Sequence, residues 1–297
     1  MPNALALMPR FLRYLLLGMA LWFVAVYFLL VYFRMQYPFS MEWQEGFGVD
    51  VVIRIFSGEK LYVRPSIEFI SCIYTPLYFY LSALVSKIIG VGFVPLRLIA
   101  FLSSLGCFFL IYRFVKKETR SPFAGILALC QFAATYKLTG WWFDCGRADS
   151  LFLLFLLAAL YGIRFHASKI GWSISAILMA FSFLTKQTAL IVAVPVMFYC
   201  FLAERRSCLY FIVPFSGIVA GSTFILNYLH DGWYWYYIFD LPAQQGVVES
   251  VLHTFWTKDL FSRLPLPSLV AVFYLFFSVK VFSKERSLFY LLSAFGM

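Results

Sequence analysis

Charged residues are scarce in this sequence, where they make up 13% of 297 residues, against roughly 25% in a typical soluble domain. So few charges argue against a soluble globular chain. Hydrophobic residues make up 63%, including 36 Phe, and they form runs of roughly 15–23 residues, close to the ~20 that cross a bilayer as a helix. These features predict an all-α polytopic membrane protein.

Patterns that hold metals or nucleic acids are also lacking. The six cysteines show no metal-ligand spacing, and most lie in apolar runs, where cysteine behaves as a small hydrophobe. A disulfide between Cys72 and Cys145 is left open. We expect no cofactor and no nucleic-acid partner, although acidic side chains could still hold a divalent metal.

Apolar runs predict the membrane-spanning helices. The first is too long for a signal-peptide core and lacks a small-residue cleavage site, so we expect it to be retained. Another apolar stretch breaks at residues 185–187, which leaves Lys186 facing outward between two short spans. The chain ends within a last run, 288–297, too short to cross. The predicted spans are residues 11–33, 93–111, 122–136, 150–165, 171–184, 188–203, 209–228 and 266–282.

The apolar stretch 75–89 is shorter, and charge decides its placement. If it lies in the interface and the N-terminus is cytoplasmic, 13 of the 24 basic residues are cytoplasmic, against only Glu118, Glu204 and Glu285. If it crosses, the basic residues divide 9 inside to 15 outside, which breaks the positive-inside rule. We therefore predict one long outer loop, residues 34–92, that carries interfacial helices.

Three carboxylates lie close together in that loop, at Glu42, Glu45 and Asp50. On a helix over residues 45–57, Glu45 falls among apolar residues and points toward the bundle, whereas Asp50 can pair with Arg54 on the opposite face. A carboxylate on an apolar face either caps the helix or is functional. Glu42 precedes this helix and is the reserve candidate.

The predicted topology places further ionisable residues on the same side, namely Asp144, Arg147, Asp149 and Lys186. A carboxylate can take the proton of an acceptor hydroxyl, and basic groups can hold a departing phosphate. The alternatives are that Asp149 caps the helix beginning at residue 150 and that Arg147 reaches the lipid headgroups.

The order of four motifs, SGEKLY, YTPLYFYLSALV, GRADSLFLLFLLAAL and FLTKQTALIVAVPV, resembles glycosyltransferases of the GT-C fold that use polyprenyl-phosphate sugars. These are the family 39-like enzymes, which include relatives of protein O-mannosyltransferase and aminoarabinose transferase. The resemblance covers roughly residues 10–205 of a single transmembrane domain, 1–297. Family members continue further, so we expect 206–297 to hold additional spans of a chain truncated at Met297.

The resemblance implies roles for individual residues. Glu45 matches the general base, with Glu42 as the alternative, and Asp149 matches the second acid, with Asp144 as runner-up. The residues that match donor-phosphate contacts are Lys186, Arg147 and, more weakly, Arg97.

The resemblance also implies an inverting hexosyl- or pentosyltransferase that acts on the outer face of a bacterial inner or plasma membrane. Its partners would be a polyprenyl-phosphate-linked sugar, the bilayer, and a glycan, lipid or protein acceptor. Two other hypotheses remain, a transporter or lipid-carrier flippase and a non-catalytic truncated remnant. Charges gathered at one surface and the lack of an internal repeat disfavour transport.

Overall fold

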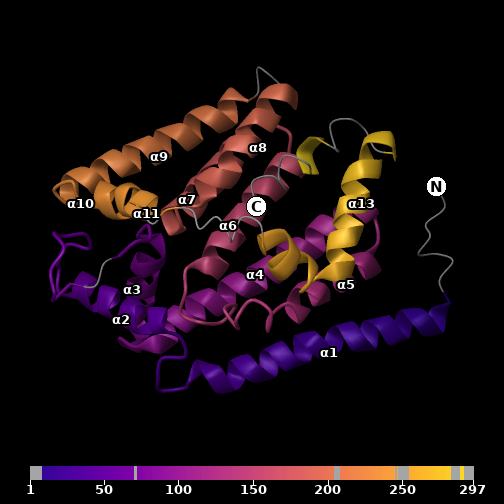
Figure 1. Ribbon diagram of the computed structural model, residues 1–297, viewed down its shortest axis with the longest axis horizontal. Helices are drawn as coiled ribbons and strands as arrows, with labels where there is room; N and C mark the ends of the chain where they lie inside the picture. Colours follow the sequence, from indigo (N-terminus) through magenta and orange to yellow (C-terminus); the bar gives the residue numbers. More distant parts are fainter. Residues whose placement is uncertain are drawn as a thin grey trace. The chain divides into compact units, whose positions relative to one another are not determined.

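A computed structural model describes residues 9–69, 72–203, 208–244, 246, 254–281 and 288–290. The chain is 77% helical, and the described residues contain no strand. Three helices are long and apolar enough to cross a membrane, namely α1 (Arg10–Met35), α4 (Phe93–Thr119) and α9 (Leu209–Leu229). These findings confirm the predicted all-α polytopic membrane protein (Figure 1).

The chain divides into two compact units, which are described separately. The first comprises Met1–Glu59 and Leu77–Tyr161, and the second comprises Lys60–Pro76 and Gly162–Met297. The sequence gives no composition shift that would have marked this division.

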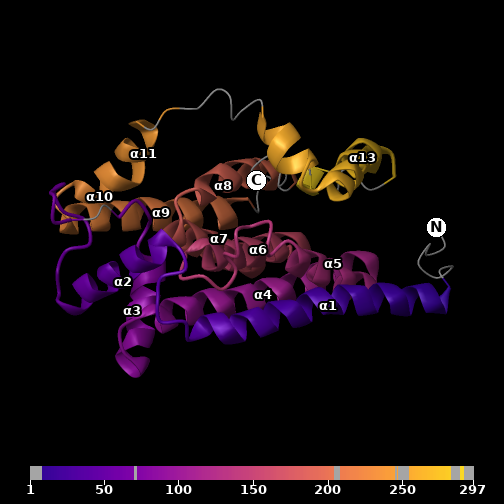
Figure 2. The same ribbon diagram turned by 60° about the horizontal axis from the view of Figure 1, so that its bottom comes forward.

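Three helices of the first unit, α1, α4 and α5 (Pro122–Ala134), lie side by side (Figure 2). Buried aromatic side chains fill the space between them, among them Tyr27 of α1 and Phe108 of α4. Gly125 brings α5 close to α4, because a Cβ atom there would lie 2.9 Å from the Tyr112 carbonyl oxygen. The buried aromatic rings and the close contact at Gly125 therefore hold α1, α4 and α5 against one another.

Two shorter helices, α2 (Trp43–Phe56) and α3 (Leu77–Ile89), pack on each other and on α4. The side chain of Glu42 accepts a hydrogen bond from the Gln44 amide at 2.8 Å and caps α2. The helix therefore starts before Glu45, where the sequence had placed its start. Phe47, Val51 and Val52 form the buried face of α2.

The predicted pair of Asp50 and Arg54 is replaced by another. Helix α2 ends at Phe56, and Gly58 adopts a left-handed conformation with φ +70°. The turn brings the Glu59 amide to 2.9 Å from the Arg54 carbonyl oxygen, so the Glu59 carboxylate reaches Arg54 Nη1 at 2.7 Å. Asp50 is exposed.

The second unit contains α7 (Lys169–Thr185), α8 (Ala189–Ala203) and α9, and α7 packs on both of the others. The predicted break is present, since residues 186–188 separate α7 from α8. Thr75 Oγ1 donates to the Phe183 carbonyl at 2.7 Å, and Gln187 Nε2 donates to the Ile73 carbonyl at 2.8 Å. These bonds attach the segment before α3 to the broken helix.

Several elements complete the described chain. Helix α6 (Asp149–Phe165) runs from the first unit into the second, and most of the predicted 288–297 run lies outside the described residues. All six cysteines are buried and free, so the disulfide left open above is not formed. The remaining elements are α10 (Trp233–Trp235), η2 (Tyr236–Asp240), α11 (Leu241–Gln244), η3 (Phe255–Phe261) and α13 (Pro265–Val281).

Candidate active site

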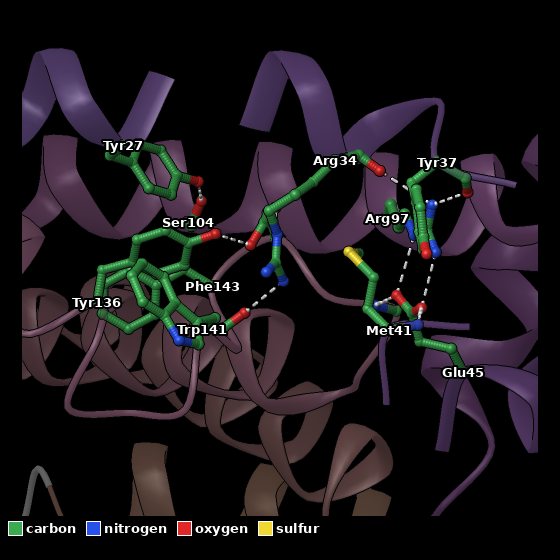
Figure 3. Close-up of polar contacts among 12 residues, drawn as sticks. Tyr27, Arg34, Tyr37, Met41, Glu45, Arg97, Ser104, Tyr136, Trp141 and Phe143 are labelled. Atoms are coloured by element: carbon green, nitrogen blue, oxygen red, sulfur yellow. Dashed lines mark hydrogen bonds and ion pairs between the residues drawn. The ribbon is translucent and has the colours of Figure 1, made fainter. Parts of the chain in front are cut away.

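Glu45 is fully buried in the first unit, and its carboxylate accepts four hydrogen bonds (Figure 3). Arg97 Nε and the Gly146 amide donate to Oε1 at 3.0 and 2.7 Å. Arg97 Nη2 and the Met41 amide donate to Oε2, each at 2.8 Å. Each oxygen thus holds two donors, which compensates the cost of burying the charge.

Arg97 is also fully buried, and it uses all five of its N–H groups. Besides Glu45, it donates from Nη1 to the carbonyl oxygens of Arg34 and Tyr37, at 3.0 and 2.6 Å, and from Nη2 to that of Phe39, at 2.8 Å. The guanidinium therefore ties the end of α1 and the chain after it to α2. No N–H of Arg97 is left for a phosphate in this arrangement.

These contacts determine the charge of Glu45. Burial raises the pKa of its carboxyl, but the hydrogen bonds from Arg97 and from the Met41 and Gly146 amides lower the pKa by more. The net result is a pKa below the ordinary value, so Glu45 is an ionised carboxylate at neutral pH.

A second ion pair joins the partly exposed Arg34 to the buried Asp144. Arg34 Nε donates to Asp144 Oδ2 at 2.9 Å, and Arg34 Nη2 donates to the Trp141 carbonyl at 3.0 Å. The Tyr136 hydroxyl donates to Asp144 Oδ1. Asp144 is 1% exposed, whereas the Arg34 side chain is 22% exposed.

The third charged group is different because its acids reach the surface. Arg147 Nη1 lies 3.1 Å from Glu42 Oε1, and Arg147 Nε lies 2.9 Å from Asp149 Oδ2. The guanidinium is 3.8 Å from the centre of the Trp142 ring, a cation–π contact. The side chains of Glu42 and Asp149 are 19% and 27% exposed, whereas that of Arg147 is 6% exposed.

Asp149 also borders a cavity of about 240 Å³ in the first unit. Aromatic rings, including that of Trp142, form much of the lining, and Thr139 and Ser150 add hydroxyl groups. A mostly apolar cavity with a few polar groups at its edge is typical of a ligand site. Asp149 thus lies at the edge of a cavity and is paired with Arg147, which also contacts the carboxylate of Glu42.

Residues 74–229, which are 156 of the 297, match the family described as dolichyl-phosphate-mannose-protein mannosyltransferase. The chain belongs to this family. It is therefore a membrane glycosyltransferase of the GT-C type that uses a polyprenyl-phosphate sugar donor, which confirms the resemblance. No curated protein and no solved structure matches the chain.

The mannosyltransferase match includes most of the predicted site residues, but Glu42 and Glu45 precede it. The structure brings Glu45 together with Arg97, Glu42 with Arg147 and Asp149, and Asp144 with Arg34. Helix α6 begins at Asp149 itself, rather than at the residue after it. The catalytic and donor-binding roles of these residues stay predictions.

Lys186 belongs to the second unit, at the break between α7 and α8. Its ammonium lies 5.7 Å from the centre of the Tyr74 ring. Among the described residues, no three His, Cys, Asp or Glu side chains are grouped so that they could hold a metal ion.

Sequence reasoning missed two residues of this candidate site. Arg34 follows an apolar run and resembles a headgroup contact, and nothing in its neighbours indicates a partner 110 positions away. Gly146 donates to Glu45, and a Cβ atom there would lie 3.2 Å from Glu45 Cγ and 3.1 Å from Leu96 Cβ. In the sequence, Gly146 was marked only as a glycine in the short loop between the candidate acids Asp144 and Asp149.

Proposed function

We propose that the protein transfers a hexosyl or pentosyl group from a polyprenyl-phosphate donor to an acceptor hydroxyl, with inversion, at the group formed by Glu42, Arg147 and Asp149. The observation that carries this proposal is that one buried arginine joins two partly exposed carboxylates beside a cavity. The family supplies the reaction class, and this cluster contains the predicted acids that solvent and substrate can reach.

The proposed step is a single displacement. The acceptor oxygen attacks the anomeric carbon opposite the phosphate, and the bond between that carbon and the phosphate oxygen breaks. Its electron pair leaves with the polyprenyl phosphate, and the acceptor proton passes to a carboxylate. We assign the carboxylate to Asp149, with Glu42 as the alternative, because Glu42 also caps α2.

Arg147 suits the neutralisation of a phosphate leaving group. A planar guanidinium can bind two oxygens at once, and its stack on Trp142 holds its plane in place. Lys186 is the second candidate for this task, from the other unit. Either cation would stabilise negative charge as it develops on the phosphate.

Glu45 and Arg97 suit a positioning role in this proposal. A general base needs a lone pair that faces the substrate, but four donors already occupy the Glu45 carboxylate. Asp144, which is buried and accepts from Arg34 and Tyr136, positions the loop before α6. We therefore move the predicted base from Glu45 to Asp149 and keep Glu45 as the residue that holds the Met41 amide and the Gly146 loop in place.

We further propose that the site faces the extracytoplasmic side of a bacterial inner or plasma membrane, with the N-terminus in the cytoplasm. The positive-inside rule supports this orientation, because the acids of the site precede α2 and α6 while the basic excess lies in the alternate loops. The acceptor would be a glycan, lipid or protein hydroxyl on that side.

The test uses the protein in proteoliposomes with a polyprenyl-phosphate-linked radiolabelled sugar. We expect Asp149→Asn to lower transfer by roughly 10²–10⁴-fold, the usual range for a general base, while the yield and melting temperature stay at wild-type values. Glu42→Gln should lower transfer less, unless Glu42 is the base. Wild-type transfer in both variants would refute the assignment.

A further inference from the structure

A separate group of basic side chains lies at the C-terminal end of α4, outside the candidate active site. Arg113, Lys116, Lys117 and Arg120 line a cavity of about 310 Å³, together with Tyr161 of α6. All five residues belong to the first unit. The proposed transfer reaction does not use any of them.

Helical geometry collects these charges on one face. At 100° per residue, Arg113, Lys116 and Lys117 fall within an arc of about 100°. Glu118 is the one acidic residue between positions 113 and 121, and it falls about 100° beyond Lys117, on another face. The cavity is thus lined by four cations and no carboxylate.

The depth of the group follows from the length of α4. The helix is a candidate membrane span that begins at Phe93, and Arg113 comes 20 residues later. This separation corresponds to about 30 Å along the axis, the thickness of the hydrocarbon core. The basic side chains therefore lie where a span reaches the lipid headgroups.

Aromatic rings hold two of the ammonium groups at the cavity. Lys116 Nζ lies 5.3 Å from the centre of the Tyr112 ring, and Lys117 Nζ lies 5.4 Å from that of Tyr161. Among the described residues, no ion pair joins Arg113, Lys116 or Arg120 to a carboxylate. Their charges thus remain available to an external anion.

Arg120 occupies a backbone position that usually belongs to glycine. It ends α4 in the left-handed conformation, with φ 55°. Ser121 then caps α5 by accepting from the Ala124 amide at 3.3 Å. An arginine at this position adds a charge to the cavity at the expense of backbone strain.

We propose that this basic cavity binds the phosphate of an anionic phospholipid headgroup in the leaflet at this end of α4. Basic pockets beside membrane spans bind such headgroups, and the cavity combines four positive charges with a position at headgroup depth. A role in topology alone would need basic residues on this side of the membrane, but not a shared cavity.

The experiment is native mass spectrometry of the detergent-solubilised protein, titrated with phosphatidylglycerol or with phosphatidylcholine. We expect Arg113→Gln/Lys116→Gln to weaken phosphatidylglycerol binding roughly 30-fold, which corresponds to about 1 kcal/mol per basic residue at 1.4 kcal/mol per tenfold change. The matched control is Arg10→Gln/Arg13→Gln at the start of α1, which removes the same charge and should bind normally. An equal loss in both variants, or in neither, would overturn the proposal.

A second variant protects the test against misfolding. Arg120→Gly suits the left-handed backbone, so the melting temperature should stay the same or rise, while phosphatidylglycerol binding weakens roughly fivefold. Unchanged binding in this variant would count against the proposal. Inorganic phosphate at millimolar concentration should not displace the lipid, and displacement would show that a soluble phosphate is the ligand instead.

Discussion

Two clusters in the first unit contain the same residue types but differ in access. In the Glu45–Arg97 pair both side chains are 0% exposed. Seven hydrogen bonds use all five N–H groups of Arg97 and give the Glu45 carboxylate four donors. In the Glu42–Arg147–Asp149 cluster the arginine is buried but the carboxylates are partly exposed. From this comparison we expect that a buried acid with all its partners in place supports the site, whereas an acid that takes a proton from a substrate remains reachable.

The largest expected effect breaks the buried pair. Arg97→Met should destabilise the protein by about 3–5 kcal/mol, because Glu45 is left as an uncompensated buried charge. The measurement is the melting temperature in detergent together with the yield of folded protein. The double variant Arg97→Met/Glu45→Leu should recover part of the loss, because it removes both charges. A melting temperature that stays at the wild-type value in Arg97→Met would show that the pair does not hold the fold.

The next effect tests how tightly the loop before α6 supports Glu45. Gly146→Ala should cost about 1–3 kcal/mol, since the added methyl group crowds Leu96 Cβ and Glu45 Cγ. The loss should appear as a lower melting temperature and reduced transfer. Gly46→Ala is the matched control, because a Cβ atom at Gly46 meets nothing within 4 Å. Equal melting temperatures for the two variants would contradict the close contact at Gly146.

Sequence periodicity could predict much of this fold and the burial of Glu45. The apolar runs predict the three helices that can span, α1, α4 and α9, and the apolar neighbours of Glu45 predict that it points inward. The interfacial placement of α3 stays a prediction. The partner of Glu45 could not be predicted, since Arg97 lies 52 positions away and contacts of that kind depend on how helices pack. Arg34 with Asp144 is the same case. The exposure that separates Asp149 from Glu45 likewise depends on the loop before α6.

A pH titration sharpens the comparison through the charge of Glu45. The pKa of Glu45 is lower in the folded protein than in the unfolded chain, where a glutamate titrates near ~4.3. Its contribution to stability is therefore fully present above that unfolded value and is lost as the pH falls through the folded pKa. The difference in unfolding free energy between wild type and Glu45→Gln should shrink as the pH falls below about 4. A difference that is constant from pH 7 to pH 3 would show that Glu45 is not held as a carboxylate.

The smallest effect on stability, and the one that separates the clusters most clearly, is expected from Arg147→Lys. The ammonium keeps the positive charge but cannot contact Glu42 and Asp149 with the planar fork of a guanidinium, and the two acids are partly hydrated already. We expect a smaller loss of stability than in Arg97→Lys, because water can partly compensate the two carboxylates. Sugar transfer should nevertheless fall, with a higher KM for the lipid-linked donor, if Arg147 holds the phosphate. Arg97→Lys is the matched control, and it should lower the melting temperature strongly because a lysine has three N–H groups for the five bonds that Arg97 makes. If the two lysine variants lose stability equally, the distinction between a buried supporting pair and an accessible reacting cluster fails.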